Sequence, residues 1–190
     1  MSSCALARPL RPGRPLAVVL SGLPGSGKST WARRFAARFD ADHVETDRIR
    51  RALFPVRTYS PAEHAAVYRA AVAAIADALR RGRTVVFDAT NLTEESRAPV
   101  RRLCDHLDAG LAIVRFAIDE AEVRRRLAAR ERGQDPADYS EAGLAVYEKM
   151  RGEARPVVGP HWLVRTEAEA DAALEAIGAW VVRARTCGSS

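Results

Sequence analysis

A short glycine-rich stretch, GLPGSGKS at residues 22–29, separates two segments of different character. The segment before it, residues 16–21, is almost continuously apolar, which is typical of a strand buried on both faces of a parallel sheet. In the segment after it, a tryptophan and two phenylalanines recur at every fourth position, which predicts an amphipathic helix over 28–39. A buried strand that turns directly into a helix begins a βαβ unit, so this stretch predicts an α/β fold.

The alternation of strand and helix continues along the chain. Ser60 and Pro61 suit the N-cap and first position of a helix, Gly82 suits its end, and the Thr93 hydroxyl is placed to cap the next helix. Further strands are predicted at 43–46, 84–87, 111–117 and 161–165, and further helices at 61–81, from 93 onward, at 120–132, 140–151 and 167–184. This order predicts a parallel sheet of about five strands with helices on both faces.

Composition narrows the possible classes of protein. The 190 residues are 47% hydrophobic and 28% charged, which is typical of a globular domain, and no apolar run is long enough to cross a membrane. The three cysteines fit no metal-binding spacing, so we expect reduced thiols and a cytoplasmic location. The net charge of +6 suits acidic partners such as nucleotides or nucleic acid. The net charge alone is weak evidence for an acidic partner, because this chain uses arginine almost throughout in place of lysine.

The glycine-rich stretch fits the phosphate-binding pattern G-x-x-x-x-G-K-[ST], the P-loop. Glycines let the loop turn its N–H groups toward a phosphate, and the dipole of the following helix points at the same anion. Lys28 is one of only two lysines in this arginine-rich chain, at a position that needs a compact charge. We predict a site for ATP, or another nucleoside triphosphate, and Mg²⁺. Its predicted residues are Gly22, Leu23, Pro24, Gly25, Ser26, Gly27, Lys28, Ser29 and Thr30, with the Ser29 hydroxyl toward the metal.

Two predicted strands end in carboxylates, and parallel strands end at a common crevice. Asp47 follows the second strand and is placed to deprotonate an attacking hydroxyl, while Arg50, one helical turn later, is placed to hold an anionic group of the acceptor. Asp88 ends the next strand and is a candidate partner of Mg²⁺, with Thr90 and Asn91 as candidate acceptor contacts. The alternative is that Asp47 and the 88–91 segment only cap helices and that Arg50 is solvated.

The predicted helix 120–132 is rich in arginine. Arg126 and Arg130 are four residues apart and share one helical face, so together they are placed to stabilise the charge of a transferring phosphoryl group from a lid at about 120–139. The alternative to a lid is a solvent-exposed helix face on which these arginines pair with nearby glutamates, and it explains the same spacing. The expected organisation is a flexible leader at 1–14, one P-loop domain at 15–185 and a tail at 186–190.

The chain resembles the kinase module of 5′-hydroxyl polynucleotide kinases over roughly residues 16–185. The resemblance implies a central P-loop strand, Asp47 as general base, Arg50 on the acceptor phosphate, and Arg126 and Arg130 on the ATP phosphates. With Lys28, Asp47 and Arg126 form the expected catalytic set. The motifs that carry the resemblance are GLPGSGKSTWAR at 22–33, Asp47-x-x-Arg50, ATNL at 89–92, Arg126-x-x-x-Arg130 and VYEKMR at 146–151.

Three functions remain open on the sequence. The first is an ATP-dependent kinase that acts on the 5′-hydroxyl end of RNA or DNA. The second is a kinase of a small molecule or sugar nucleotide, a class in which zeta-toxin-like enzymes share the P-loop, the aspartate and the lid. The third is an ATP-binding regulatory ATPase. Asp138 and Tyr139 are further candidates for the acceptor pocket. We expect Trp162 in the core, no structural metal among the four histidines, no membrane attachment and no obligate protein partner.

Overall fold

The structure, a computed structural model, describes residues 13–131 and 144–186. The strands are β1 (Leu16–Ser21), β2 (Asp42–Glu45), β3 (Val85–Asp88), β4 (Gly110–Phe116) and β5 (Trp162–Val164). The helices are α1 (Lys28–Phe39), α2 (Thr46–Leu53), α3 (Pro61–Arg80), α4 (Glu94–His106), α5 (Glu120–Glu131), α6 (Leu144–Arg151) and α7 (Glu167–Thr186).

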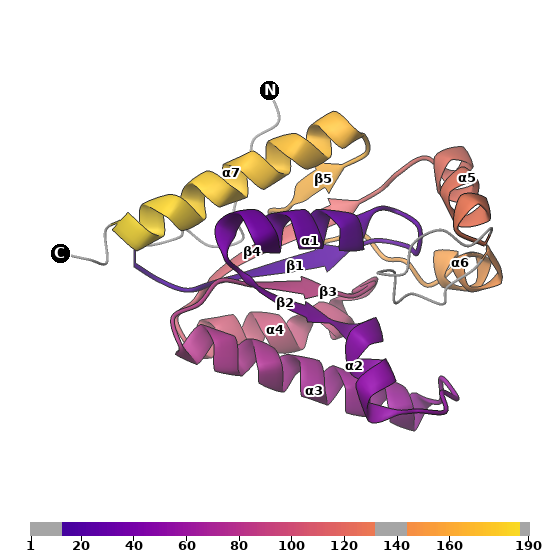
Figure 1. Ribbon diagram of the computed structural model, residues 1–190, viewed down its shortest axis with the longest axis horizontal. Helices are drawn as coiled ribbons and strands as arrows, with labels where there is room; N and C mark the ends of the chain where they lie inside the picture. The colour runs from indigo at the N-terminus through magenta and orange to yellow at the C-terminus, as the bar shows by residue number, and fades with distance from the viewer. Residues whose placement is uncertain (1–12, 132–143, 187–190) are drawn as a thin grey trace.

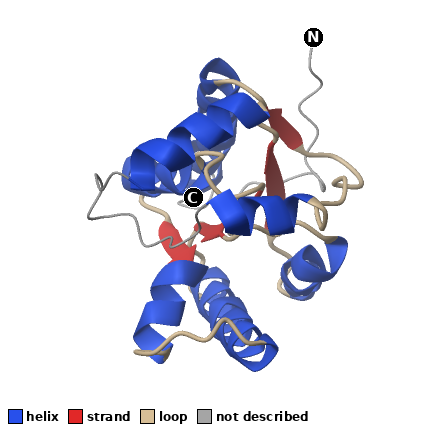
Figure 2. Ribbon diagram, turned by 90° about the vertical axis from the view of Figure 1, so that its right-hand side faces the viewer, coloured by secondary structure: helices blue, strands red, loops and turns tan. Residues whose placement is uncertain are grey.

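The five strands form one parallel sheet in the order β2-β3-β1-β4-β5. The strand that enters the P-loop is therefore central, as the family resemblance implies. Helices α1 and α7 cover one face of the sheet, and α3 and α4 cover the other (Figure 1). Helices α5 and α6 lie beyond the carboxyl ends of the strands, and Figure 2 looks onto that edge.

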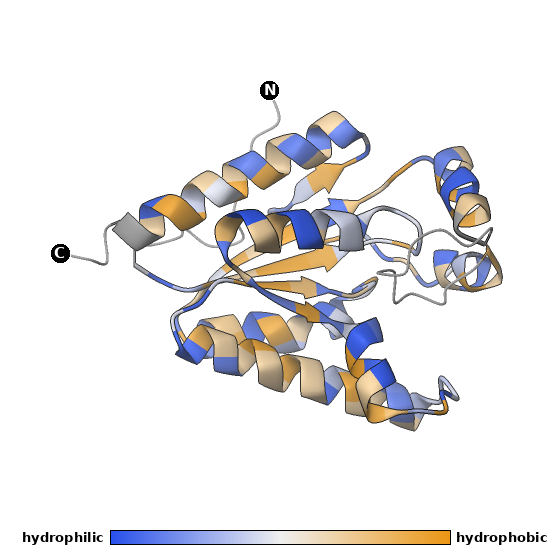
Figure 3. Ribbon diagram, viewed as in Figure 1, coloured by the Kyte–Doolittle hydropathy of each residue, from blue (hydrophilic) through white to orange (hydrophobic). Residues whose placement is uncertain are grey.

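The sheet is buried on both sides, which explains its composition. All six residues of β1 are buried, and the hydropathy colouring shows apolar strands between helices with polar outer faces (Figure 3). One apolar cluster joins β1 and β4 to α1 and α7, and a second joins β1, β3 and β4 to α3 and α4. Side chains alternate across each strand, so the same strands contribute to both clusters and fix the register of the sheet.

Local signals set the helix boundaries. The Ser60 hydroxyl accepts a hydrogen bond from the Glu63 N–H, and Pro61 occupies the first helical position of α3. Thr93 and Ser96 form a reciprocal capping box at the start of α4. These interactions satisfy N–H groups that a helix leaves without partners at its beginning. Both starts agree with the sequence prediction.

The structure departs from the sequence prediction mainly at α2, which begins directly after β2 and was not predicted as a separate helix. The first residues of the helix predicted at 140–151, and Asp138 and Tyr139, lie outside the described residues, as do most of the leader and the tail. Within the described ranges, no helix is long and apolar enough to cross a bilayer, and Cys104 is buried in the second apolar cluster. Trp162 is half-buried against the first apolar cluster.

Candidate active site

The P-loop connects the end of β1 to the start of α1. Gly25 and Gly27 have φ values of 75° and 91°, a left-handed conformation that disfavours side chains, and Gly27 is the N-cap of α1. The Lys28 ammonium donates hydrogen bonds to the Leu23 carbonyl at 2.8 Å and to Ser26 Oγ at 3.3 Å. The lysine is thereby folded into the concave side of the loop, where P-loop lysines bind phosphate.

Helix α5 packs directly on this loop. A Cβ at Gly25 would lie 2.9 Å from Leu127 Cγ and 3.1 Å from Val123 Cγ1. Val123 and Leu127 also form a small apolar cluster with Tyr147 of α6, against which Leu23 of the P-loop packs. Glycine at position 25 therefore serves two requirements, the left-handed backbone and the close approach of α5. The lid helix predicted at 120–132 is in contact with the phosphate-binding loop.

Arg126 extends from α5 toward the same loop. A Cβ at Gly27 would lie 3.1 Å from Arg126 Nη1, and Arg126 Nε donates a 2.6 Å hydrogen bond to Glu122 Oε1. Hydrogen bonds from Arg125 and then Arg126 lower the pKa of Glu122 to about 2, so the carboxylate stays charged and holds both arginines. The Arg130 side chain lies outside the described part of α5, and its role stays a prediction.

A cavity of about 360 Å³ adjoins the P-loop on the side of α7. Its apolar lining comes from Trp31, Phe116, Ile118, Val164 and Ala170, and its polar lining includes Thr30, Arg34, Arg126, Thr166 and Glu167. The cavity combines apolar walls with a few polar groups next to a phosphate-binding loop. That combination suits a planar, partly polar ligand such as a nucleoside.

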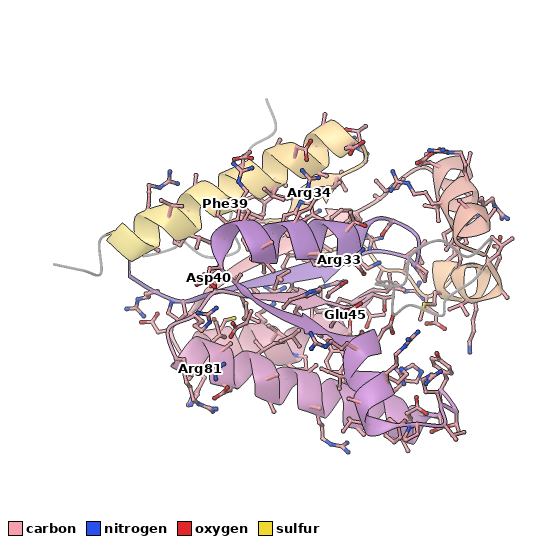
Figure 4. The ribbon with its side chains drawn as sticks, viewed as in Figure 1. Arg33, Arg34, Phe39, Asp40, Glu45 and Arg81 are labelled. Atoms are coloured by element: carbon pink, nitrogen blue, oxygen red, sulfur yellow. The ribbon has the colours of Figure 1, made fainter. Side chains whose placement is uncertain are left out.

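A group of carboxylates lies where β2 and β3 end. Glu45 is paired in register with Asp88, which is 3% exposed and lies 3.4 Å from His43 Nε2 through its Oδ2 atom. Burial, followed by the charge of Asp88, raises the pKa of Glu45 to about 7, while the charges of His43 and Arg33 oppose this rise. Figure 4 labels Glu45 at the end of β2 and Arg33 on α1. Glu45 was not among the predicted site residues, although its place at a strand end was the available signal.

No group of three or more histidine, cysteine, aspartate or glutamate side chains suited to a metal occurs among the residues that the structure describes. Asp88 nevertheless lies at the carboxyl end of β3, next to the central strand, and Ser29 is half-buried in the first turn of α1. This donor set suits Mg²⁺, which typically binds one or two protein oxygens together with phosphate and water. The assignment of Ser29 and Asp88 to Mg²⁺ stays a prediction.

Asp47 lies in the first turn of α2 and is half-buried. Its negative charge contributes to the raised pKa of Glu45, so the two carboxyl groups are close enough to interact electrostatically. The structure thus brings Asp47 to the same edge of the sheet as Glu45 and Asp88. Its role as a general base stays a prediction.

Arg50 differs from the open anion-binding arginine that the sequence predicted. It is 6% exposed, and its guanidinium donates a 2.6 Å hydrogen bond to Glu63 Oε1 and lies 3.1 Å from His64 Nδ1 and 5.0 Å from the Tyr59 ring centre. Burial acts to raise the pKa of Glu63, but hydrogen bonds from Arg50, Thr58 and Tyr59 lower it to about 2. Arg50 therefore joins α2 to α3 in a buried ion pair.

Asn91 also differs from the acceptor contact that the sequence predicted, whereas acceptor binding by the Thr90 side chain stays a prediction. Asn91 is 2% exposed; its Nδ2 donates to the Leu20 carbonyl at 2.8 Å, and its Oδ1 accepts from the Tyr68 hydroxyl at 2.9 Å. The Thr90 carbonyl accepts from the Gly22 N–H at 2.9 Å. Because protein partners occupy both ends of the Asn91 amide, this segment fixes the base of the P-loop instead of presenting Asn91 to a ligand.

A family model described as an AAA domain matches residues 18–157, which include the P-loop, the carboxylates of β2 and β3 and helix α5. The chain belongs to this AAA domain family. A search of curated proteins found no significant match. Comparison with solved structures shows that the fold is an α/β P-loop fold with a five-stranded parallel sheet.

Three solved structures illustrate the likeness. A candidate kinase from Chloroflexus aurantiacus is 17% identical, with a TM-score of 0.67 over 88% of this chain and 97% of that one. The Mycobacterium tuberculosis APS kinase CysC, solved with AMPPNP and APS, is 19% identical, with a TM-score of 0.65 over 90% and 99%. Chaetomium thermophilum Kti12, solved with ADP-AlF3, is 19% identical, with a TM-score of 0.67 over 85% and 96%. At these identities the likeness concerns the fold.

Proposed function

We propose that the protein is an ATP-dependent kinase that transfers the γ-phosphoryl group of ATP to a hydroxyl acceptor, and that the acceptor is the 5′-hydroxyl end of a polynucleotide. The observation that carries the proposal is the position of Arg126 against Gly27, which places a guanidinium over a phosphate-binding loop. Kinases use such a charge to stabilise the transferring phosphoryl group. The solved APS kinase and Kti12 were crystallised with nucleotide analogues, which supports a nucleotide in the corresponding place.

The chain's own residues divide the work of binding. The P-loop amides and Lys28 hold the β- and γ-phosphates, and the cavity beside the P-loop, whose lining includes Trp31 and Ala170, receives the nucleoside. Ser29 and Asp88 hold Mg²⁺, which supplies positive charge to the phosphate oxygens when it is bound. Glu122 keeps Arg126 directed at the loop through its 2.6 Å hydrogen bond.

Asp47 acts on the acceptor. In the transfer step, the acceptor oxygen forms a bond to the γ-phosphorus, the bond from that phosphorus to the bridging oxygen breaks, and ADP leaves with the electron pair. The acceptor proton passes to the Asp47 carboxylate. A positioned base of this kind accelerates transfer by roughly 10²- to 10⁴-fold.

The polynucleotide acceptor is supported by the sequence motifs and by the charge around the crevice. Helix α2 presents Arg48 and Arg51 at exposed positions, next to Asp47 in the chain. Lys149 of α6 is close enough to His64 to contribute, after burial and Arg50, to lowering the pKa of that histidine. Basic groups of α2 and α6 therefore lie near the carboxyl edge of the sheet, which suits a polyanionic substrate.

Incubation with γ-labelled ATP and a panel of acceptors tests the proposal. The panel contains a 5′-hydroxyl oligonucleotide, the same oligonucleotide with a 5′-phosphate, a nucleoside, a sugar and an aminoglycoside. We expect label only on species with a free 5′-hydroxyl, and most on the oligonucleotide. Label on the sugar or aminoglycoside alone would support the small-molecule alternative, and release of labelled phosphate without any labelled acceptor would support the regulatory ATPase.

A further inference from the structure

Arg115 interrupts an otherwise apolar strand at the carboxyl edge of the sheet. It lies in β4, in register with Ser21 at the end of the P-loop strand, and it is half-buried. Its Nη1 donates to Ser21 Oγ at 3.3 Å, and the fully buried Ser21 donates in turn to the Asn91 carbonyl at 2.9 Å. The same carbonyl accepts from Arg97 Nη1 at 2.7 Å. Arg115 is therefore held in place through a hydrogen-bonded chain at the base of the P-loop.

Arg115 has no carboxylate partner among residues 13–131 and 144–186. The two buried arginines, Arg50 and Arg97, each pair with a glutamate. Among the described residues, no carboxylate lies within ion-pairing distance of Arg115, and the Ser21 hydroxyl accepts from only one of its five N–H donors. Burial lowers the pKa of Arg115, and the positive charge of Arg97 lowers it further. Arg115 therefore carries its charge in a partly desolvated place without a carboxylate beside it among the described residues, and a bound anion would stabilise that charge.

We propose that Arg115 binds an anionic group of the acceptor, namely the phosphate nearest to the hydroxyl that is phosphorylated. The inference rests on the proposed function and specifies its substrate class: an acceptor that carries both a hydroxyl and a phosphate. Ligands of open α/β sheets bind at the carboxyl edge beside the central strand, where Arg115 lies. Arg115 thereby takes the role that the sequence assigned to Arg50, whose guanidinium is paired with Glu63.

Acceptor binding is the direct test, because it does not require turnover. The full chain is saturated with a non-hydrolysable ATP analogue, which occupies the P-loop. Calorimetry then measures the binding of a deoxynucleoside 3′-phosphate and of its parent deoxynucleoside, with inorganic phosphate as a competitor. The variants are Arg115→Gln and Arg115→Lys, and the matched control is Arg102→Gln, which removes an exposed arginine from α4. Circular dichroism checks that each variant is folded.

We expect the wild type and Arg102→Gln to bind the 3′-phosphate more tightly than the nucleoside, with inorganic phosphate competing. Arg115→Gln should weaken 3′-phosphate binding by roughly 10- to 100-fold and leave nucleoside binding unchanged. Arg115→Lys keeps the charge but not the planar fork, so an intermediate loss is expected. If Arg115→Gln does not fold, the lysine variant decides, and unchanged 3′-phosphate binding by it would overturn the proposal.

Equal binding of both ligands by the wild type, or an unchanged preference in a folded Arg115→Gln variant, would also overturn the inference. The same variants assayed with γ-labelled ATP separate this outcome from failure of the proposed function. If the wild type labels the oligonucleotide while the preference for phosphate does not depend on Arg115, the anion site is wrong and the kinase stands. If binding depends on Arg115 but no acceptor is labelled, the site stands and the kinase proposal fails.

Discussion

Leu127 of α5 packs directly on Gly25 of the P-loop, and a Cβ at position 25 would lie 2.9 Å from Leu127 Cγ. Gly25→Ala therefore adds a steric contact to the cost of a left-handed alanine. Gly82→Ala is the matched control, because Gly82 has φ 74°, against 75° for Gly25, and no atom within 4 Å of its Cβ position. We expect each variant to lose about 1–2 kcal/mol of unfolding free energy from backbone strain. Only Gly25→Ala should bind an ATP analogue more weakly in a fluorescence titration, and equal affinities would contradict the docking of α5.

Gly178 of α7 faces the Phe39 ring of α1, and a Cβ at position 178 would lie 1.9 Å from Phe39 Cζ. Alanine normally stabilises a helix relative to glycine, but here overpacking should dominate and cost about 1–3 kcal/mol in urea unfolding. Phe39→Leu in the Gly178→Ala background should recover part of the loss. Gly152→Ala, whose Cβ would meet nothing closer than 4.0 Å, should change stability little. A stabilised Gly178→Ala variant would show that the α1–α7 packing is wrong.

Glu45 predicts a pH dependence of stability. Its pKa is raised from 4.5 to about 7, mainly by burial and then by Asp88, with a smaller contribution of the same sign from Asp47 and opposing ones from His43 and Arg33. The stability contribution of a group with a raised pKa is complete below its unfolded pKa and is lost as the pH rises through its folded pKa.

The unfolding free energy of the wild type should therefore fall relative to that of Glu45→Gln between about pH 5 and about pH 8. Urea unfolding of both proteins across this range measures the difference directly, and the other titrating groups largely cancel in the comparison. A constant difference between wild type and variant would show that Glu45 does not titrate in this range.

Arg126 and Arg125 are adjacent and share Glu122, yet only Arg126 approaches the P-loop. Arg126→Ala should lower kcat by roughly 10²- to 10³-fold, as expected for loss of a charge on the transferring phosphoryl group. Arg125→Ala, which removes a side chain that is 76% exposed, should change kcat by less than about twofold. Hydrogen exchange across α5 should also slow when an ATP analogue binds. Equal effects of the two substitutions would argue for a solvated face without a role in transfer.

Much of the fold was predictable because its signals are local. The buried run of β1, the glycines before Lys28 and the caps at Ser60 and Thr93 each specify structure within a few residues. Once the order of strands and helices was known, the preference for parallel βαβ connections was enough to predict a parallel sheet with helices on both faces. The place of the P-loop between β1 and α1 followed from the same local pattern.

The misplaced residues depend on contacts that a linear pattern does not contain. Arg50 was expected in the crevice, but its partner Glu63 lies thirteen residues away and meets it only because α2 packs on α3. Asn91 is fixed by Leu20, 71 positions earlier. Glu45 and Arg115 were visible in the sequence as charges near the carboxyl ends of β2 and β4, but their meaning depended on the register between strands.

The central claim is transfer to a hydroxyl, and Asp47 separates transfer from nucleotide binding. The most direct measurement is single-turnover transfer of label from γ-labelled ATP to a 5′-hydroxyl oligonucleotide by the wild type, Lys28→Ala and Asp47→Asn. We expect Lys28→Ala to lose transfer while remaining folded, and Asp47→Asn to bind ATP normally but transfer roughly 10²- to 10⁴-fold more slowly. The account is supported if the wild type labels the oligonucleotide, Lys28→Ala does not, and Asp47→Asn binds ATP but transfers slowly. Phosphate release without labelled oligonucleotide, at equal rates in the wild type and Asp47→Asn, would contradict it.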